Sequence, residues 1–175
     1  MTKISSMCLV SIIILFSVTA FAQDRGSLAI GYGFAVLSEI GKIGKIEEGH
    51  YDFIQLSYIF ERPLTEKLAF LIEPFAAYVN RPNNGFEGGM LLSGKYYFRD
   101  KQHNGFFLTL GGGGAYTSVN FKEQDTHDLF ILQGGIGFKW KEFFIENRLR
   151  HYSNGGTAQP NRSINSNIVV VGMDF

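Results

Sequence analysis

His151 and Ser153, a histidine and a serine two positions apart, are the residues of this chain with the clearest chemical signal. Side chains two apart on a β-strand point to the same face, and their Cα atoms lie roughly 7 Å apart at about 3.3 Å rise per residue. A serine hydroxyl is a poor nucleophile unless an adjacent base accepts its proton, and an imidazole is such a base. The pair therefore predicts a histidine-activated serine nucleophile, provided that both residues lie on one strand. The alternative is that they are a histidine and a serine at the exposed end of a strand, without a catalytic role.

The first 22 residues have the pattern of an export signal. Lys3 provides the positive end, an apolar run extends from Met7 to Ala20, and Ala20-Phe21-Ala22 gives the small-x-small pattern of a cleavage site. The apolar run is too short for a comfortable membrane helix of about 20 residues. We expect cleavage to remove residues 1–22, including Cys8, the single cysteine, and to leave residues 23–175 as one domain without thiol chemistry.

The composition after Ala22 narrows the class of protein. Because only Lys3 is charged in the signal, the remainder carries 15 basic and 16 acidic residues, which does not favour nucleic acid as a partner. No later apolar stretch approaches the length of a membrane helix. The chain holds 21 glycines, 17 phenylalanines and 8 tyrosines but only 4 prolines, and this enrichment in an exported chain favours antiparallel β-structure.

Alternating hydrophobicity predicts eight strands. They cover about 28–36, 51–62, 67–80, 86–98, 105–119, 129–140, 143–153 and 165–175, and no helix signal separates them. The segment Ser38–Gly49 is predicted to be a long loop. Most of these strands are longer than the usual 5 to 6 residues and suit a tilted membrane crossing. The sequence therefore predicts an all-β fold, an eight-stranded antiparallel transmembrane β-barrel of the outer membrane, whose narrow interior is filled by side chains.

The strand 143–153 indicates which residues face the interior. Its even positions include Glu146, Arg148 and Arg150, and charges on the lipid side are costly, so the even side is the lumen, where we expect a salt-bridge network. His151 and Ser153 must then face outward. In strand 165–175 the apolar residues at odd positions, which end at Phe175, form the lipid-facing side. Asn165 is also at an odd position, so it faces outward as well. With the N-terminus starting in the periplasm, the long loop 154–164 lies outside the cell, and the three residues lie near the extracellular rim.

Two other features have simpler explanations than a ligand site. The glycine run Gly111–Gly114 lacks the Gly-Lys-Ser/Thr sequel of a phosphate-binding loop, so we interpret it as close backbone packing or curvature within a strand. His50, His103 and His127 lack the spacing of metal ligands and are predicted to be solvated.

At its last hairpin the chain resembles a known family. His-Tyr-Ser-Asn-Gly-Gly at 151–156, followed by Gln159-Pro160-Asn161, looks like PagL, the outer-membrane lipid A 3-O-deacylases. The resemblance implies hydrolysis of an ester-linked 3-hydroxyacyl chain from lipid A, without a metal or a cofactor. His151 matches the family's base and Ser153 its nucleophile. Matching positions around the nucleophile, where oxyanion donors are expected, fall on Asn154, Gly156 and Asn161.

One position departs from the family pattern. The carboxylate of the family's triad, twelve residues after the serine, falls on Asn165. The acid of a triad orients the imidazole and stabilises its cation. An asparagine carbonyl provides the orientation but no charge, so we expect either a slower enzyme or a carboxylate from elsewhere in the chain.

The expected partners are lipid A or lipopolysaccharide as substrate, the surrounding outer-membrane lipids, and the barrel-assembly machinery, which would bind the C-terminal Phe175. The sequence leaves open whether the chain forms a homodimer. It also leaves two alternatives to the deacylase: a non-catalytic barrel that stabilises the membrane or binds a surface ligand, and an esterase acting on phospholipid.

Overall fold

The computed structural model describes residues 24–37, 42–98 and 104–175. The predicted signal peptide with Cys8, part of the predicted loop 38–49, and His103 lie outside the described residues. Within these ranges no helix is long and apolar enough to cross a membrane.

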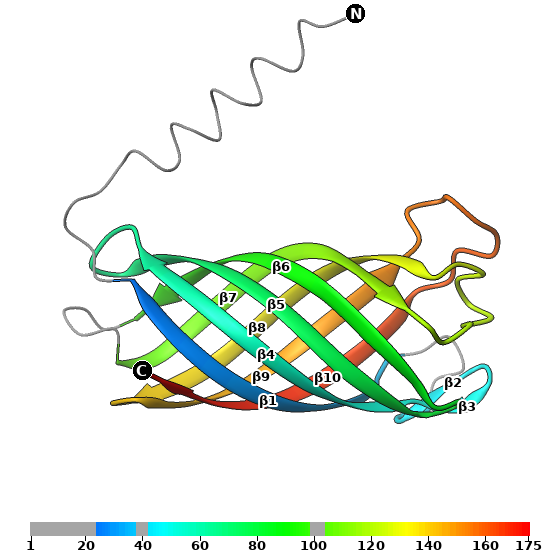
Figure 1. The fold of residues 1–175 in the computed structure, drawn as a ribbon, viewed down its shortest axis with the longest axis horizontal. Coiled ribbons are helices and arrows are strands. Elements are labelled where there is room, and N and C mark those ends of the chain that lie inside the picture. The colour runs from blue at the N-terminus through cyan, green and yellow to red at the C-terminus, as the bar shows by residue number, and fades with distance from the viewer. Residues whose placement is uncertain (1–23, 38–41, 99–103) are drawn as a thin grey trace, which may run out of the picture.

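Eight long strands close into an antiparallel barrel, as the sequence predicted (Figure 1). Going around the barrel, the order is β1, β10, β9, β8, β7, β6, β5 and β4. Their bounds are β1 Arg25–Ala35, β4 Asp52–Pro63, β5 Leu68–Arg81, β6 Gly85–Tyr97, β7 Gly105–Thr117, β8 Asp128–Trp140, β9 Phe143–Ser153 and β10 Ile164–Asp174. The connection between β1 and β4 is not plain loop, because it carries a short hairpin, β2 Lys45–Ile46 and β3 Gly49–His50.

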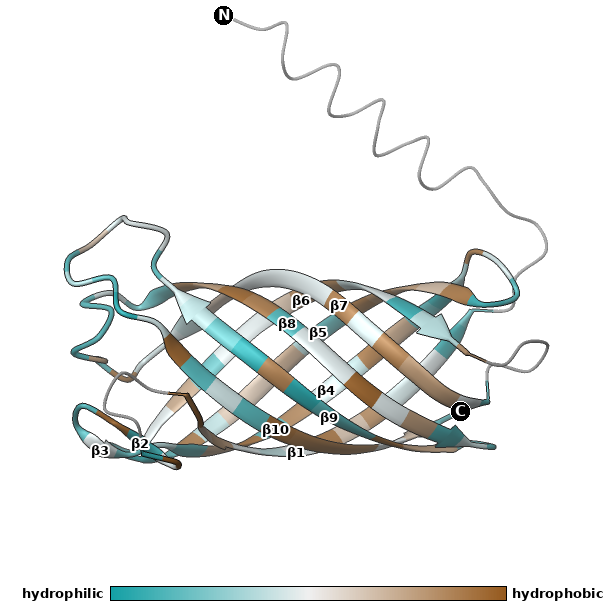
Figure 2. Cartoon of the chain, turned by 180° about the vertical axis from the view of Figure 1, so that it is seen from behind, coloured by the Kyte–Doolittle hydropathy of each residue, from teal (hydrophilic) through white to brown (hydrophobic). Residues whose placement is uncertain are grey.

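The two ends of the barrel differ. β1 begins and β10 ends at one end, and the longer connections, including β2, β3 and the segment 154–163, gather at the other (Figure 1). We call the latter the loop end. In Figure 2 this end is mostly hydrophilic, whereas apolar residues recur along the strands.

The outer wall is apolar, as strand parity requires. Along each long strand the more exposed residues alternate with buried ones, and the exposed ones are largely leucine, isoleucine, valine, methionine and aromatics. Such a wall is the surface that a membrane barrel presents to lipid.

The lumen holds a network of charges, which confirms the interpretation of β9. Arg148 Nη1 lies 2.8 Å from Glu73 Oε1, and its Nη2 lies 2.9 Å from Glu146 Oε2. Arg150 donates to Gln55 Oε1 at 2.8 Å and to Gln133 Oε1 at 2.9 Å. Two more lumenal ion pairs join Lys95 to Glu61 and Lys139 to Asp174.

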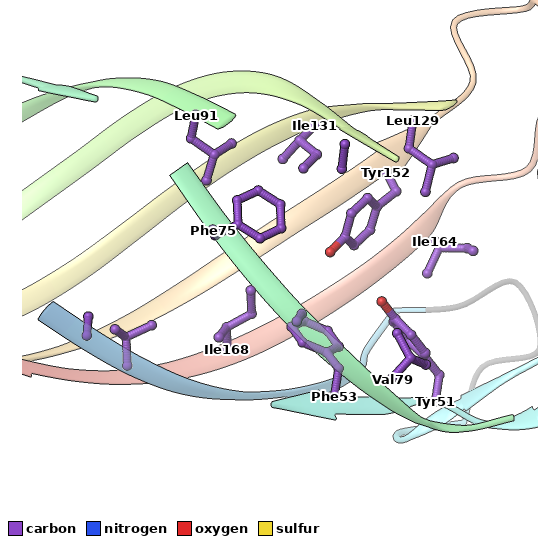
Figure 3. Close-up of a cluster of buried hydrophobic side chains, with 14 of the residues drawn as sticks. Tyr51, Phe53, Phe75, Val79, Leu91, Leu129, Ile131, Tyr152, Ile164 and Ile168 are labelled. Atoms are coloured by element: carbon purple, nitrogen blue, oxygen red, sulfur yellow. The ribbon is translucent and has the colours of Figure 1, made fainter. Parts of the chain in front are cut away.

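The sequence alone leaves the facing of β5 ambiguous, because Glu73 and Pro74 lie in its interior, and the structure resolves it. Glu73 is buried in the lumen with Arg148, so Pro74 faces outward. Apolar residues also fill the lumen, including Phe53, Phe75 and Tyr152 (Figure 3). The interior is therefore a packed core, as expected of eight strands.

The glycine run lies within β7 and not in a ligand-binding loop. A Cβ atom on Gly113 would overlap the carbonyl oxygen of Met90 on the neighbouring β6. Close backbone packing therefore explains this glycine, as predicted.

Candidate active site

His151 and Asn165 are direct partners across β9 and β10, on the outer face near the loop end. His151 Nδ1 lies 2.9 Å from Asn165 Oδ1, and both side chains are partly exposed. The predicted outward parity of both residues is observed. The antiparallel register brings them together although 14 residues separate them.

The surroundings of Asn165 define which tautomer the neutral imidazole adopts. Asn165 Nδ2 donates to the backbone carbonyl oxygen of Leu37 at 3.2 Å, which turns Oδ1 towards His151. Because an amide oxygen only accepts hydrogen bonds, His151 Nδ1 must be the donor. In the neutral ring Nε2 then carries the free lone pair, as a general base requires.

Ser153 lies at the end of β9 and is held by the loop that follows. Its Oγ donates to Asn161 Oδ1 at 3.2 Å and accepts from the backbone N–H of Gly155 at 3.0 Å. Within the described part of the chain, His151 is not a hydrogen-bond partner of this hydroxyl. Ser153 and His151 share the outer face but are not joined in this state.

The side chain of Asn154 is fully buried and anchors the loop. Its Nδ2 donates to the carbonyl oxygens of Gln124 at 2.8 Å, Ala158 at 3.0 Å and Pro160 at 3.1 Å. Its Oδ1 accepts from the N–H of Gly156 at 2.8 Å. The hydrogen bonds of the Asn154 side chain thus fix the loop. The backbone N–H of Asn154 instead points to Asn161, the residue that accepts the hydrogen bond from Ser153.

That backbone N–H and the serine hydroxyl share one acceptor. Asn154 N–H donates to Asn161 Oδ1 at 3.2 Å, the same atom that accepts from Ser153. Gly156 has φ +81°, a left-handed conformation that favours glycine, and the turn it makes brings the chain back towards Asn161. Five of the predicted residues therefore lie on one loop and strand end.

Neighbouring loops support this loop through residues that the sequence did not single out. Gln124, in the β7–β8 connection, bonds through its side chain to the Arg162 carbonyl oxygen, and Arg162 N–H donates to the Glu123 carbonyl oxygen at 2.8 Å. Arg162 also forms an exposed ion pair with Glu47 at 2.7 Å. No local motif marks these residues, because each contact joins two loops distant in sequence.

An apolar groove of about 240 Å³ begins at the His151–Asn165 pair on the outer wall. The groove surrounds Gly134 of β8. It is lined by outward leucines of three strands and by the segment that follows β1. Its lining includes Leu110, Leu132, Gly134 and Leu149. A polar pair beside an apolar groove suits a substrate with a polar ester and a hydrocarbon tail.

Among the described residues, no group of three or more histidine, cysteine, aspartate or glutamate side chains is placed to hold a metal ion.

Comparisons with known proteins bear on the family and the fold of this chain. A family model described as lipid A 3-O-deacylase (PagL) matches residues 54–174, a span that contains all six predicted site residues. The chain is similar to the crystal structure of the outer membrane enzyme PagL, with a TM-score of 0.59 and 20% identity over 86% of this chain and 99% of that one.

Two other barrels are similar in fold. The N-terminal β-barrel domain of Pseudomonas aeruginosa OprF has a TM-score of 0.51 and 13% identity over 88% of this chain and 99% of that one. The Yersinia pestis outer membrane protein Ail has a TM-score of 0.54 and 12% identity over 87% of this chain and 100% of that one. No curated protein matches the sequence. The barrel is thus of the kind found in outer-membrane proteins.

Proposed function

Because this chain belongs to the lipid A 3-O-deacylase (PagL) family, we propose that it is an outer-membrane serine esterase that removes an ester-linked 3-hydroxyacyl chain from lipid A. The observation that carries the proposal is the hydrogen-bonded His151–Asn165 pair, which lies on the lipid-facing wall beside Ser153. A catalytic pair in this position meets a membrane lipid without the lipid leaving the bilayer.

In the proposed reaction, Ser153 Oγ attacks the ester carbonyl carbon and its proton passes to His151 Nε2. The tetrahedral intermediate collapses, the C–O bond to the sugar breaks, and the sugar oxygen takes the proton from His151. Water, deprotonated by the same nitrogen, then attacks the acyl carbonyl carbon, the bond to Ser153 Oγ breaks to release the fatty acid, and His151 returns the proton to Oγ. Asn165 holds the imidazole in the tautomer that these proton transfers need.

The hydroxyl must change partner before it can attack. In the resting arrangement it donates to Asn161 Oδ1, and in the reacting arrangement it donates to His151. Catalytic hydrogen bonds are often absent in a free enzyme and form in the substrate complex, so the resting geometry is compatible with this role.

The oxyanion donors we propose are the backbone N–H of Asn154 and the side-chain amide of Asn161, which reorients to present its Nδ2. Both groups already lie around the serine hydroxyl. The conformation of Gly156 permits the tight turn that brings them there. The buried Asn154 side chain is assigned the supporting role of fixing the loop.

We further propose that the loop end faces the cell surface. Both chain ends of the barrel then lie on the periplasmic side, the usual arrangement for single-chain bacterial barrels with short periplasmic turns and longer external loops. His151 and Ser153 would lie at the level where the sugar esters of lipid A meet the acyl chains.

The test is mass spectrometry of lipid A from cells that produce the wild type or the Ser153→Ala variant, with folding checked by the heat-dependent gel mobility of the barrel. Loss of one 3-hydroxyacyl mass with the wild type alone is the expected result. Unchanged lipid A in both samples, with folded barrels, would refute the proposal and favour a non-catalytic barrel. Release of fatty acid from phospholipid instead would identify the other alternative.

A further inference from the structure

Gly134 creates a gap in the lipid-facing wall beside the catalytic pair. It occupies an outward position of β8, where the neighbouring outward positions are Leu132 and Ile136. Across the sheet it pairs with Leu110 of β7 and Leu149 of β9. A residue without a side chain, surrounded by these larger ones, accounts for the floor of the apolar groove.

The groove is continuous with the proposed active site. His151 pairs with Leu132, two residues along the strand from the Leu149–Gly134 pair, and both His151 and Asn165 line the groove. Gly134 therefore lies four residues below Ser153, about 13 Å along the strand at roughly 3.3 Å per residue. One leaflet of a hydrocarbon core is about 15 Å thick, so an acyl chain that spans it from Ser153 is long enough to reach this position.

The neighbouring path on the β10 side is polar. Asn147 Nδ2 donates to Asn167 Oδ1 at 3.0 Å, and Asn167 Nδ2 donates to Asn147 Oδ1 at 2.9 Å. These amides lie on the outer wall below Asn165, where a hydrocarbon chain would cover polar atoms. The route over Leu132, Gly134 and Leu149 offers apolar contact instead.

We propose that Gly134 is a specificity-determining residue: the gap it leaves receives the hydrocarbon tail of the ester bound at Ser153 and gives the enzyme its preference for long acyl chains. The inference rests on the proposed esterase function. It extends that function from the ester bond that is hydrolysed to the length of the acyl chain that is preferred.

The backbone at Gly134 accepts a side chain, which makes the test direct. A Cβ atom there would lie 3.7 Å from Leu110 Cδ1 and 3.8 Å from the carbonyl oxygen of Thr109, which are ordinary contacts. Gly134→Leu fills the groove, and Gly134→Ala fills it partly with less demand on folding. Gly88 of β6 is also outward, and its Cβ would meet only the Phe75 carbonyl oxygen at 3.8 Å, so Gly88→Leu is the matched control.

The measurement is kcat/KM of the purified, folded barrels on two esters of the same glucosamine, one with a myristoyl chain and one with a butanoyl chain. Changes of a single methylene in an apolar pocket alter specificity by about 10- to 200-fold. We therefore expect Gly134→Leu to lower kcat/KM for the myristoyl ester by at least about tenfold, and for the butanoyl ester by less than about twofold. Gly134→Ala should fall between, and Gly88→Leu should match the wild type.

An equal loss of kcat/KM on both esters, or no loss of kcat/KM with Gly134→Leu and Gly134→Ala, would overturn the inference. The proposed esterase function would be unaffected by either result. Failure of the wild type to hydrolyse either ester would instead refute the proposed function and the inference with it.

Discussion

Replacing Asn165 by aspartate should accelerate the enzyme. The side chain keeps its length, so one carboxylate oxygen can take the place of Oδ1, 2.9 Å from His151 Nδ1. In the proposed mechanism the imidazole becomes positively charged when it accepts the Ser153 proton, and a carboxylate stabilises this cation whereas an amide supplies no net charge.

The expected magnitude follows from the surroundings of the pair. Two unit charges about 4 Å apart interact by about 1 kcal/mol in water and about 4 kcal/mol at the effective dielectric near a protein surface, and a partly exposed site lies between these values. Aspartate also loses the bond from Asn165 Nδ2 to the Leu37 carbonyl oxygen, which costs about 1 kcal/mol. The net gain of about 1–2 kcal/mol corresponds to roughly a 5- to 30-fold rise in kcat/KM.

The assay is the initial rate of 3-hydroxy fatty acid release from lipid A by refolded protein in detergent. Asn167→Asp is the control, because it adds the same charge to the same face but its amide contacts Asn147 and not His151. Asn165→Ala, which removes one neutral hydrogen bond worth about 1 kcal/mol, should be about fivefold slower than the wild type. An Asn165→Asp rate at or below that of the wild type, or an equal rise with Asn167→Asp, would refute the reasoning.

Three further predictions concern the residues around the site and below it. Asn161→Asp keeps an acceptor but removes the amide N–H, so kcat should fall about 10²- to 10³-fold; an unchanged kcat would exclude Asn161 as an oxyanion donor. Asn154→Ala removes four side-chain hydrogen bonds, one buried and three part-buried, each worth about 1 kcal/mol, so limited proteolysis should cut the following loop while the barrel keeps its gel mobility. Arg148→Met leaves Glu73 and Glu146 buried without their cation and should lower the free energy of unfolding by about 3–5 kcal/mol in urea titrations. Glu73→Gln should cost less, because Arg148 keeps Glu146; equal losses would contradict the ion-pair geometry.

The sequence by itself determined the barrel and the outward facing of the candidate site residues. Strand parity is a local property, since successive side chains point to opposite sides of a sheet. Three charges at even positions of β9 therefore identified the lumen, and His151 and Ser153 had to face outward. Where parity was blurred, as in β5 with Glu73 and Pro74, the sequence left the facing open.

Only the tertiary structure decided how the site is held. The Leu37 carbonyl that orients Asn165 is 128 residues away in sequence, and the Gln124 carbonyl that anchors Asn154 is 30 residues away. The short hairpin of β2 and β3 and the gap at Gly134 likewise depend on neighbouring segments. Hydrogen-bond partners of this kind follow from barrel closure and loop packing, which bring distant segments together. A local pattern of residue types therefore does not predict them.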